Sequence, residues 1–220
     1  TWANVTVAEA GIAAAGHDHD TDYLAIDGTA VDSELLDGMD ATAFAVAGGV
    51  FLDSGQSLGT DVSHSVAVGD LDGDGDLDAF VGTYYYEGTY PGQNKVWFND
   101  GTGVFADSGQ GLGAAWSLGV SLGDVDGDGD LDAVVANTTL TSGAANKVWL
   151  NDGYGTFSDS GQTLGTDWSY YAALGDLDGD GDLDVFVGNS GANEVWLNDG
   201  SGTFSNSGQS LGSSSSADVS

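Results

Sequence analysis

Three nearly identical acidic stretches contain the chain's best candidates for ligands of a metal ion. The first reads Asp-Leu-Asp-Gly-Asp-Gly-Asp-Leu-Asp over Asp70–Asp78. It recurs at Asp124–Asp132, where Val replaces the first Leu, and at Asp176–Asp184. The five carboxylates of one stretch would repel one another strongly in an empty loop. A hard divalent cation removes this repulsion, and calcium accepts about six to eight oxygen ligands in irregular geometry.

Each stretch, here termed an acidic loop, has the register of a calcium loop. Carboxylates stand at loop positions 1, 3 and 5, a turn glycine at 6, a residue suited to bind through its main-chain carbonyl at 7, and a carboxylate at 9. Because this register occurs three times, we expect about three calcium ions per chain. The candidate metal-binding residues are Asp70, Asp72, Asp74, Asp76, Asp78, Asp124, Asp126, Asp128, Asp130, Asp132, Asp176, Asp178, Asp180, Asp182 and Asp184.

The acidic loops belong to a longer repeat that extends over residues 50–212. Their first residues are 54 and 52 positions apart. Asn-Lys-Val-Trp-Phe-Asn-Asp-Gly at Asn94–Gly101 recurs with one or two substitutions at Asn146–Gly153 and Asn193–Gly200. The length variation falls between the acidic loop and the tryptophan, which predicts exposed loops on one face of the assembly.

The pattern inside each repeat predicts β-strands. In the first repeat they are expected at 65–68, 79–81, 95–98 and 104–106, with a tight Asn-Asp-Gly turn before the last. Four short strands in roughly 50 residues are typical of one propeller blade. An EF-hand is excluded, because its twelfth ligand would be Val81, Val135 or Val187. The predicted fold is an all-β, β-propeller-like array of three full four-stranded blades.

On these motifs, residues 51–212 resemble FG-GAP/VCBS-type repeats, the calcium-loop blades also found in integrin alpha-subunit propellers. The resemblance covers about three-quarters of the chain. It implies a protein outside the cell or at its surface, with an adhesive, carbohydrate-associated or other cell-surface role.

Residues 1–49 are a separate segment with two interpretations. A shift of 54 residues places Asp18, Asp20 and Asp22 on loop positions 3, 5 and 7, as in a degenerate first blade. Alternatively, Gly-His-Asp-His-Asp and the stretch from Leu35 to Phe44 resemble segments of phage tail-fibre and bacterial surface-fibre proteins. That resemblance implies a second metal site, for a transition metal, at His17 and His19 of several converging chains. The Ser-rich residues 213–220 are interpreted as a flexible end.

Charge restricts the partners. The chain has 35 acidic residues and two basic ones, for a formal net charge of −33. Nucleic acid is excluded because its phosphates require clustered Lys and Arg. Membrane insertion is not expected, since no run of about 18 apolar residues occurs. The expected partners are copies of the chain itself, glycans or surface proteins.

Catalysis is not expected, since the chain has no cysteine or arginine and only three histidines. We interpret His64 as an ordinary surface residue. The best candidates for ligand contact are Tyr84, Tyr85 and Tyr86, in the loop of variable length. Asn4 and Asn137 begin N-glycosylation sequons.

Two functions remain open at this point. The first is an extracellular, calcium-stabilised structural or adhesive repeat protein. Its uncovered blade edges could join copies head to tail into a filament or surface fibre. The second is a carbohydrate- or ligand-binding module of a larger secreted or cell-surface protein.

Overall fold

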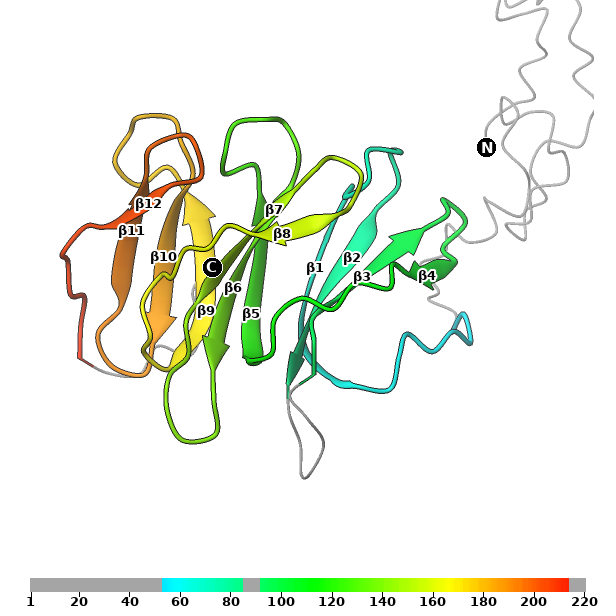
Figure 1. Ribbon diagram of the computed structural model, residues 1–220, viewed down its shortest axis with the longest axis horizontal. Coiled ribbons are helices and arrows are strands. Elements are labelled where there is room, and N and C mark those ends of the chain that lie inside the picture. The colour runs from blue at the N-terminus through cyan, green and yellow to red at the C-terminus, as the bar shows by residue number, and fades with distance from the viewer. Residues whose placement is uncertain (1–52, 85–91, 214–220) are drawn as a thin grey trace, which may run out of the picture. The chain divides into compact units, whose positions relative to one another are not determined.

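The computed structural model describes residues 53–84 and 92–213, and every regular element in these ranges is a β-strand. The strands form three four-stranded antiparallel sheets, and each sheet contains four consecutive strands in chain order (Figure 1). We term these sheets blade 1 (β1–β4), blade 2 (β5–β8) and blade 3 (β9–β12). The prediction of an all-β, propeller-like array is confirmed.

The strand bounds repeat from blade to blade. Blade 1 contains β1 (Val62–Gly69), β2 (Asp78–Tyr84), β3 (Lys95–Asn99) and β4 (Phe105–Asp107). Blade 2 contains β5 (Trp116–Gly123), β6 (Asp132–Thr138), β7 (Lys147–Asn151) and β8 (Phe157–Asp159). Blade 3 contains β9 (Ser169–Gly175), β10 (Asp184–Asn189), β11 (Glu194–Asn198) and β12 (Phe204–Asn206).

The chain divides between Ser54 and Gly55 into two units, and the three blades lie in the second. Residues 1–49, with both of their interpretations, lie outside the described residues. The boundary at residue 49 and the flexible end at 213–220 stay predictions.

The acidic loops and the loops of variable length lie at opposite ends of the blades. Each acidic loop joins the first strand of a blade to the second, at the upper end of Figure 1. The connections from the second strand to the third, where the repeats differ in length, begin at the other end. The blades therefore have a metal end and a loop end.

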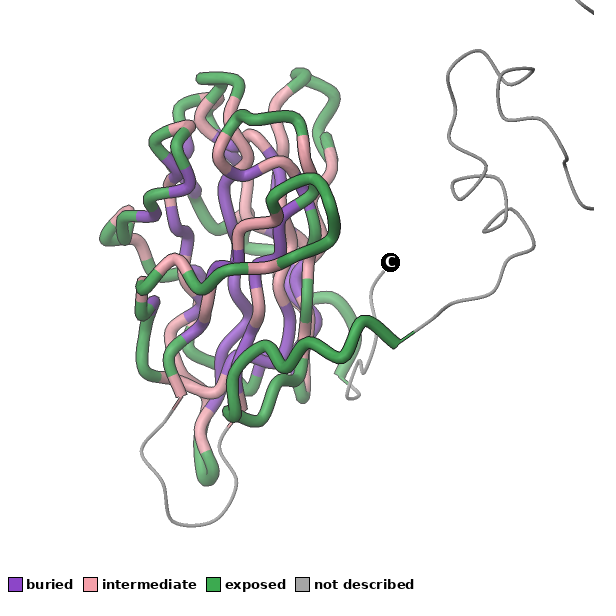
Figure 2. Tube along the Cα trace, turned by 90° about the vertical axis from the view of Figure 1, so that its right-hand side faces the viewer, coloured by how far each residue is buried: buried purple, intermediate pink, exposed green. Residues whose placement is uncertain are grey.

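Apolar side chains of neighbouring blades form two cores. One contains Phe80 and Val96 of blade 1 with Val135 and Trp149 of blade 2. The other joins the opposite face of blade 2 to blade 3. Every residue of β6 is buried, because blade 2 has a neighbour on each face. Figure 2 shows these buried segments running through the middle of the array, with exposed loops around them.

The first strand of each blade carries one extra residue at the same place. The pairing of β1 with β2 skips His64, that of β5 with β6 skips Leu118, and that of β9 with β10 skips Tyr170. Such β-bulges redirect a side chain and increase the local twist of the strand. The first strands of all three blades, β1, β5 and β9, therefore carry a bulge near the loop end.

A repeated segment, Ser-Gly-Gln-x-Leu-Gly, clamps each blade to the next. We term these segments connectors; they occupy 54–59, 108–113, 160–165 and 207–212. The Gln110 side chain donates to Gly155 O at 2.7 Å and accepts from Phe157 N at 2.9 Å, so the connector after blade 1 binds the β7–β8 hairpin of blade 2. Gln162 makes the same pair of bonds to blade 3.

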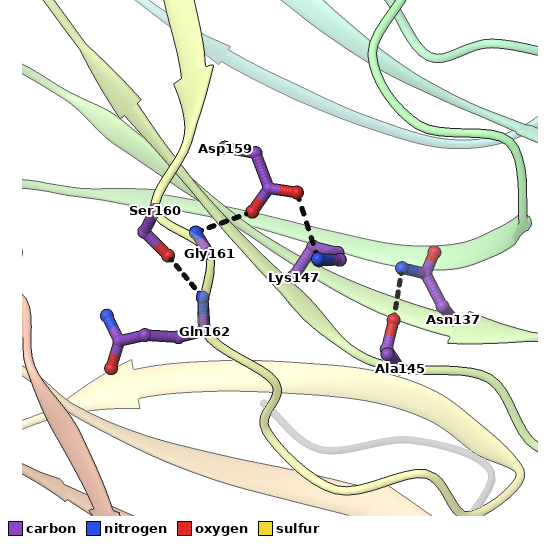
Figure 3. A network of polar contacts seen from close by, with 7 residues as sticks. All are labelled: Asn137, Ala145, Lys147, Asp159, Ser160, Gly161 and Gln162. Atoms are coloured by element: carbon purple, nitrogen blue, oxygen red, sulfur yellow. Dashed lines mark hydrogen bonds and ion pairs between the residues drawn. The ribbon is translucent and has the colours of Figure 1, made fainter.

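Local side-chain hydrogen bonds fold the connector after blade 2 into a turn (Figure 3). Asp159 accepts from Gly161 N at 2.8 Å, and Ser160 Oγ accepts from Gln162 N at 3.3 Å. Lys147 donates to the other oxygen of Asp159 at 2.9 Å and ties this turn to β7. These bonds form a turn that presents Gln162 to the next blade.

Close backbone packing at Gly119 allows β5 and β9 to lie side by side. A Cβ at this position would lie 2.8 Å from Tyr170 O and 2.9 Å from Tyr171 Cα. We therefore expect Gly119→Ala to lower the free energy of unfolding by about 1–3 kcal/mol, as overpacking does. Urea denaturation at saturating calcium measures it. Gly175→Ala is the matched control, since the nearest atom to its Cβ position lies 4.0 Å away; an equal effect of both variants would contradict this account.

Candidate metal centres

Each acidic loop brings three carboxylates into one cluster. The carboxylates at loop positions 1, 3 and 9 offer oxygen atoms that all lie within 4.8 Å of one another. The three clusters are Asp70, Asp72 and Asp78; Asp124, Asp126 and Asp132; and Asp176, Asp178 and Asp184. Carboxylates from the two ends of the loop thus converge on one point.

The loop backbone orients the carboxylate at position 1. In loop 1, Asp70 accepts hydrogen bonds from Gly73 N at 2.9 Å and from Gly75 N at 3.1 Å. Gly73 and Gly75 have φ values of 78° and 96°, in the left-handed region that favours glycine. The same two bonds occur in the other loops. The glycines therefore fold the chain back over its own first carboxylate.

The carboxylate at position 9 joins the loop to the sheet. Asp132 is fully buried. Its Oδ2 accepts from Val125 N at 3.0 Å and its Oδ1 accepts from Asn151 N at 2.9 Å. One side chain thus connects the start of the loop, the start of β6 and the end of β7.

Electrostatics in the clusters favour a bound cation. Burial, and after it the charges of Asp126 and Asp128, raise the pKa of Asp132 to about 6 against the lowering effect of its two backbone hydrogen bonds. Burial, and then neighbouring carboxylates, also raise the pKa values of Asp72, Asp126 and Asp178. Ionised carboxylates are therefore disfavoured in these clusters unless a positive charge joins them.

The donor set fits a hard divalent cation. Each cluster offers carboxylate oxygens, and such ligands suit calcium, magnesium or manganese. A bound ion would neutralise the clustered charges and connect the two ends of the loop. The clusters consist of residues that could hold three metal ions.

Two of the five predicted ligands in each loop lie outside the cluster. The carboxylate at position 5 accepts from the backbone N of position 7, as Asp128 does from Asp130 N at 3.0 Å. The carboxylate at position 7 lies against the turn after the third strand. A Cβ on Gly153 would come within 3.0 Å of both carboxylate oxygens of Asp130. The same holds for Asp182 against Gly200, and the two carboxylate oxygens of Asp76 come within 3.1 Å of a Cβ on Gly101.

An asparagine that the sequence assigned only to a turn connects the acidic loops of blades 1 and 2 to the next blade. Asn151 Nδ2 of blade 2 donates to Leu71 O, at position 2 of the loop in blade 1, at 2.9 Å. Asn198 Nδ2 makes the equivalent bond to Val125 O at 2.7 Å. The recurrence of this Asn in the Trp-x-Asn-Asp-Gly landmark was the signal, but a partner in another repeat cannot be read from one repeat.

The remaining predicted site residues are scattered. The described Tyr84 lies at the loop end of β2, with its ring centroid 4.7 Å from that of Trp116. His64 Nδ1 donates to Leu118 O at 3.0 Å. Asn137 is buried, donates to Ala145 O and accepts from Ser117 Oγ, an arrangement that a glycan on its Nδ2 would break. The other candidates lie outside the described residues: Asn4, His17, His19, Tyr85 and Tyr86.

An aromatic cleft of about 230 Å³ lies at the loop end and had not been predicted as a site. Residues of all three blades line it. They are Tyr84, Trp116, Leu118, Thr138, Thr139, Leu140, Trp168 and Tyr170. Within the described residues, no helix is long and apolar enough to cross a membrane.

The cluster geometry predicts unequal roles within one loop. Asp132→Asn should abolish any stabilisation that added calcium gives through loop 2, because it removes a clustered, buried carboxylate. Asp130→Asn is the matched control, with the same change two residues away, and it should keep most of that stabilisation. The measurement is the calcium-dependent shift in melting temperature. Equal losses in the two variants would contradict the assignment of the ligands.

Comparisons with known proteins place these repeats in a family. The model of the FG-GAP-like repeat matches residues 84–135, 124–187 and 176–220, and that of the FG-GAP repeat matches 63–98. These matches do not reach residues 1–49, and the expected likeness of that segment to fibre proteins is not supported. No curated protein matches the chain.

One similar solved structure is that of an Agrocybe aegerita lectin, described as specifically recognising non-reducing terminal N-acetylglucosamine. It is 26% identical, with a TM-score of 0.43. The match covers 67% of this chain and 38% of the lectin chain, so the chain spans well under half of that protein's length. The family matches, by contrast, extend over more than half of the chain and include all three acidic loops. The chain therefore belongs to the family of FG-GAP-like repeat proteins.

Proposed function

We propose that the chain is an extracellular, calcium-stabilised structural and adhesive repeat protein whose copies associate head to tail. FG-GAP repeats are typical of extracellular and surface proteins, and family membership supports a binding or structural role rather than a catalytic one. One observation carries the proposal. At both ends of the array, apolar side chains are exposed at repeat positions whose equivalents are buried between two blades.

The outer face of blade 1 shows this exposure at three positions. Val66, Val68 and Leu77 are 62%, 60% and 59% exposed. The equivalent residues of blade 2 pack against the core that it shares with blade 1; they are Val120, Leu122 and Leu131. Covering the exposed part of each side chain would contribute about 1 kcal/mol.

The outer face of blade 3 presents the complementary half of the same interface. Leu177, at loop position 2, is 49% exposed, whereas its equivalents Leu71 and Val125 are 1% and 2% exposed. A blade 1 placed on this face would meet it as blades 2 and 3 meet their predecessors. Because the two faces are different, such a contact is heterologous and continues from copy to copy.

The last connector lacks the partner that the other connectors have. Among the described residues, the Gln209 side chain has no hydrogen-bond partner, and no atom lies within 4 Å of a Cβ placed on Gly212. Gln56, the equivalent residue before blade 1, donates to Gly103 O at 2.6 Å and accepts from Phe105 N at 2.9 Å. Gln209 of one copy could take the place of Gln56 on blade 1 of the next.

Calcium is the ion that we propose for the three clusters, since the irregular, carboxylate-rich loops suit its flexible coordination. Each site that is filled at about 100 times its Kd would add about 2.7 kcal/mol to the free energy of unfolding. Excess chelator should therefore lower the melting temperature by more than about 10 °C in scanning calorimetry. Calcium added back should restore the melting temperature. A melting temperature that excess chelator leaves unchanged would contradict stabilisation by a metal.

Association should depend on the two glutamines in opposite ways. We expect Gln209→Ala to weaken self-association and Gln56→Ala to strengthen it, because the two side chains compete for the same backbone atoms of blade 1. Sedimentation velocity of concentrated protein with calcium measures the oligomer distribution.

Two surface variants test the interface, one placed within it and one outside it as a control. Val68→Lys, on the outer face of blade 1, should abolish association because it buries a charge. Tyr154→Lys should leave it unchanged, since Tyr154 is 79% exposed on the central blade. A wild-type protein that stays monomeric at every concentration would refute the head-to-tail proposal.

Ligand binding is a second candidate function, favoured by the aromatic cleft at the loop end. Its walls come from loops and strand ends, where the fold tolerates variation and where binding sites are commonly found. The predicted ligand contact Tyr84 is one of its lining residues.

A further inference from the structure

We propose that the aromatic cleft binds an organic cation of the quaternary ammonium class. This inference rests on the second proposed function, ligand binding, and names the ligand chemistry. It follows from three observations: aromatic walls held in place by the blades, several lining polar groups already engaged in the protein, and a strongly negative chain.

The aromatic walls are held by contacts between blades. Trp116, which begins β5, packs on Tyr84 of blade 1. Trp168, which directly precedes β9, donates its indole N–H to Thr139 O of blade 2 at 3.0 Å. Each tryptophan thus lies against the loop end of the preceding blade. Trp168 remains 40% exposed, so its ring is accessible from solvent.

The β-bulges add two further walls. Leu118 and Tyr170, the extra residues of β5 and β9, both line the cleft. A regular strand would place successive side chains on alternate faces, whereas a bulge redirects one of them. The repeated bulge is therefore a feature of the fold that contributes directly to this site.

Several polar groups of the lining are already engaged. Thr138 Oγ1 donates to Ser142 O at 3.1 Å, and Thr139 Oγ1 lies 2.8 Å from the same carbonyl oxygen. The Trp168 indole N–H is used as well. Among the described residues, no charged or carboxamide side chain lines the cleft. A sugar, whose many hydroxyls need partners when buried, is poorly served here, whereas a quaternary ammonium group needs no hydrogen bond.

Charge selects a cation for these walls. Aromatic faces carry partial negative charge and attract ammonium groups that lie over the ring. The chain has a net charge of −33, and both lysines form ion pairs elsewhere, Lys95 with Asp107 and Lys147 with Asp159. The field of the whole protein therefore concentrates cations and repels anions.

The experiment compares choline with 3,3-dimethylbutanol, its uncharged carbon isostere, on the full chain with calcium. Tryptophan fluorescence and calorimetric titrations give the two Kd values. We expect choline to bind at least about tenfold more tightly, since the two differ mainly in charge. Added salt should weaken choline binding and leave the isostere unchanged, because salt screens the field of the protein.

Variants locate the binding. Trp168→Leu should raise the Kd for choline about fivefold to thirtyfold through loss of one aromatic face. Tyr170→Leu should do the same and serves if Trp168→Leu fails to fold. Tyr154→Ala removes an exposed aromatic residue outside the cleft and should leave the Kd unchanged.

The outcomes separate the ligand class from the function. Equal binding of both compounds, sensitive to Trp168→Leu, would overturn the cation and retain ligand binding at the cleft. Binding of a neutral monosaccharide in place of choline would do the same. Absence of binding by all three probes to a folded, calcium-loaded protein would overturn both. Choline binding that Trp168→Leu and Tyr170→Leu leave unchanged would remove the cleft as its location.

Discussion

The structure depends on a buried carboxylate at the end of each acidic loop. Asp78, Asp132 and Asp184 are fully buried, and each accepts backbone hydrogen bonds from the loop and from the third strand. A buried anion is costly unless a positive charge compensates it. A cation of the kind that the clusters suit would supply that charge, and its binding would then be coupled to formation of the blade.

This constraint extends from one blade to the next. Asn151 and Asn198 each bind two acidic loops. The backbone N–H donates to Asp132 or Asp184 in the loop of the same blade, and the side chain donates to the loop of the preceding blade. The connector glutamines form a second link at the hairpin of the following blade. Loss of a cation from one loop would therefore also destabilise the neighbouring blade.

The two ends of the blades have different tasks. The metal end is the same in all three repeats, with the same hydrogen bonds and the same glycine turns. The loop end differs from repeat to repeat. The cleft takes Trp116 and Trp168 from one repeat position, where blade 1 has Val62, and Tyr84 from the end of β2. A constant end that confers stability leaves the variable end free to acquire a ligand or a partner.

The local features of the chain could be predicted from its sequence. The three acidic loops, the four strands of each blade and the strict turn glycines follow from spacing, because each depends on residues within about ten positions of one another. Which carboxylates converge became clear only from the folded structure. Those of positions 1, 3 and 9 lie together, whereas that of position 7 lies against the turn after the third strand of the same blade. The folded structure also decided the bond from Asn151 to Leu71, the clamp of each glutamine and the aromatic cleft. These features join residues from different repeats, and a repeated sequence marks equivalent positions without showing which of them touch.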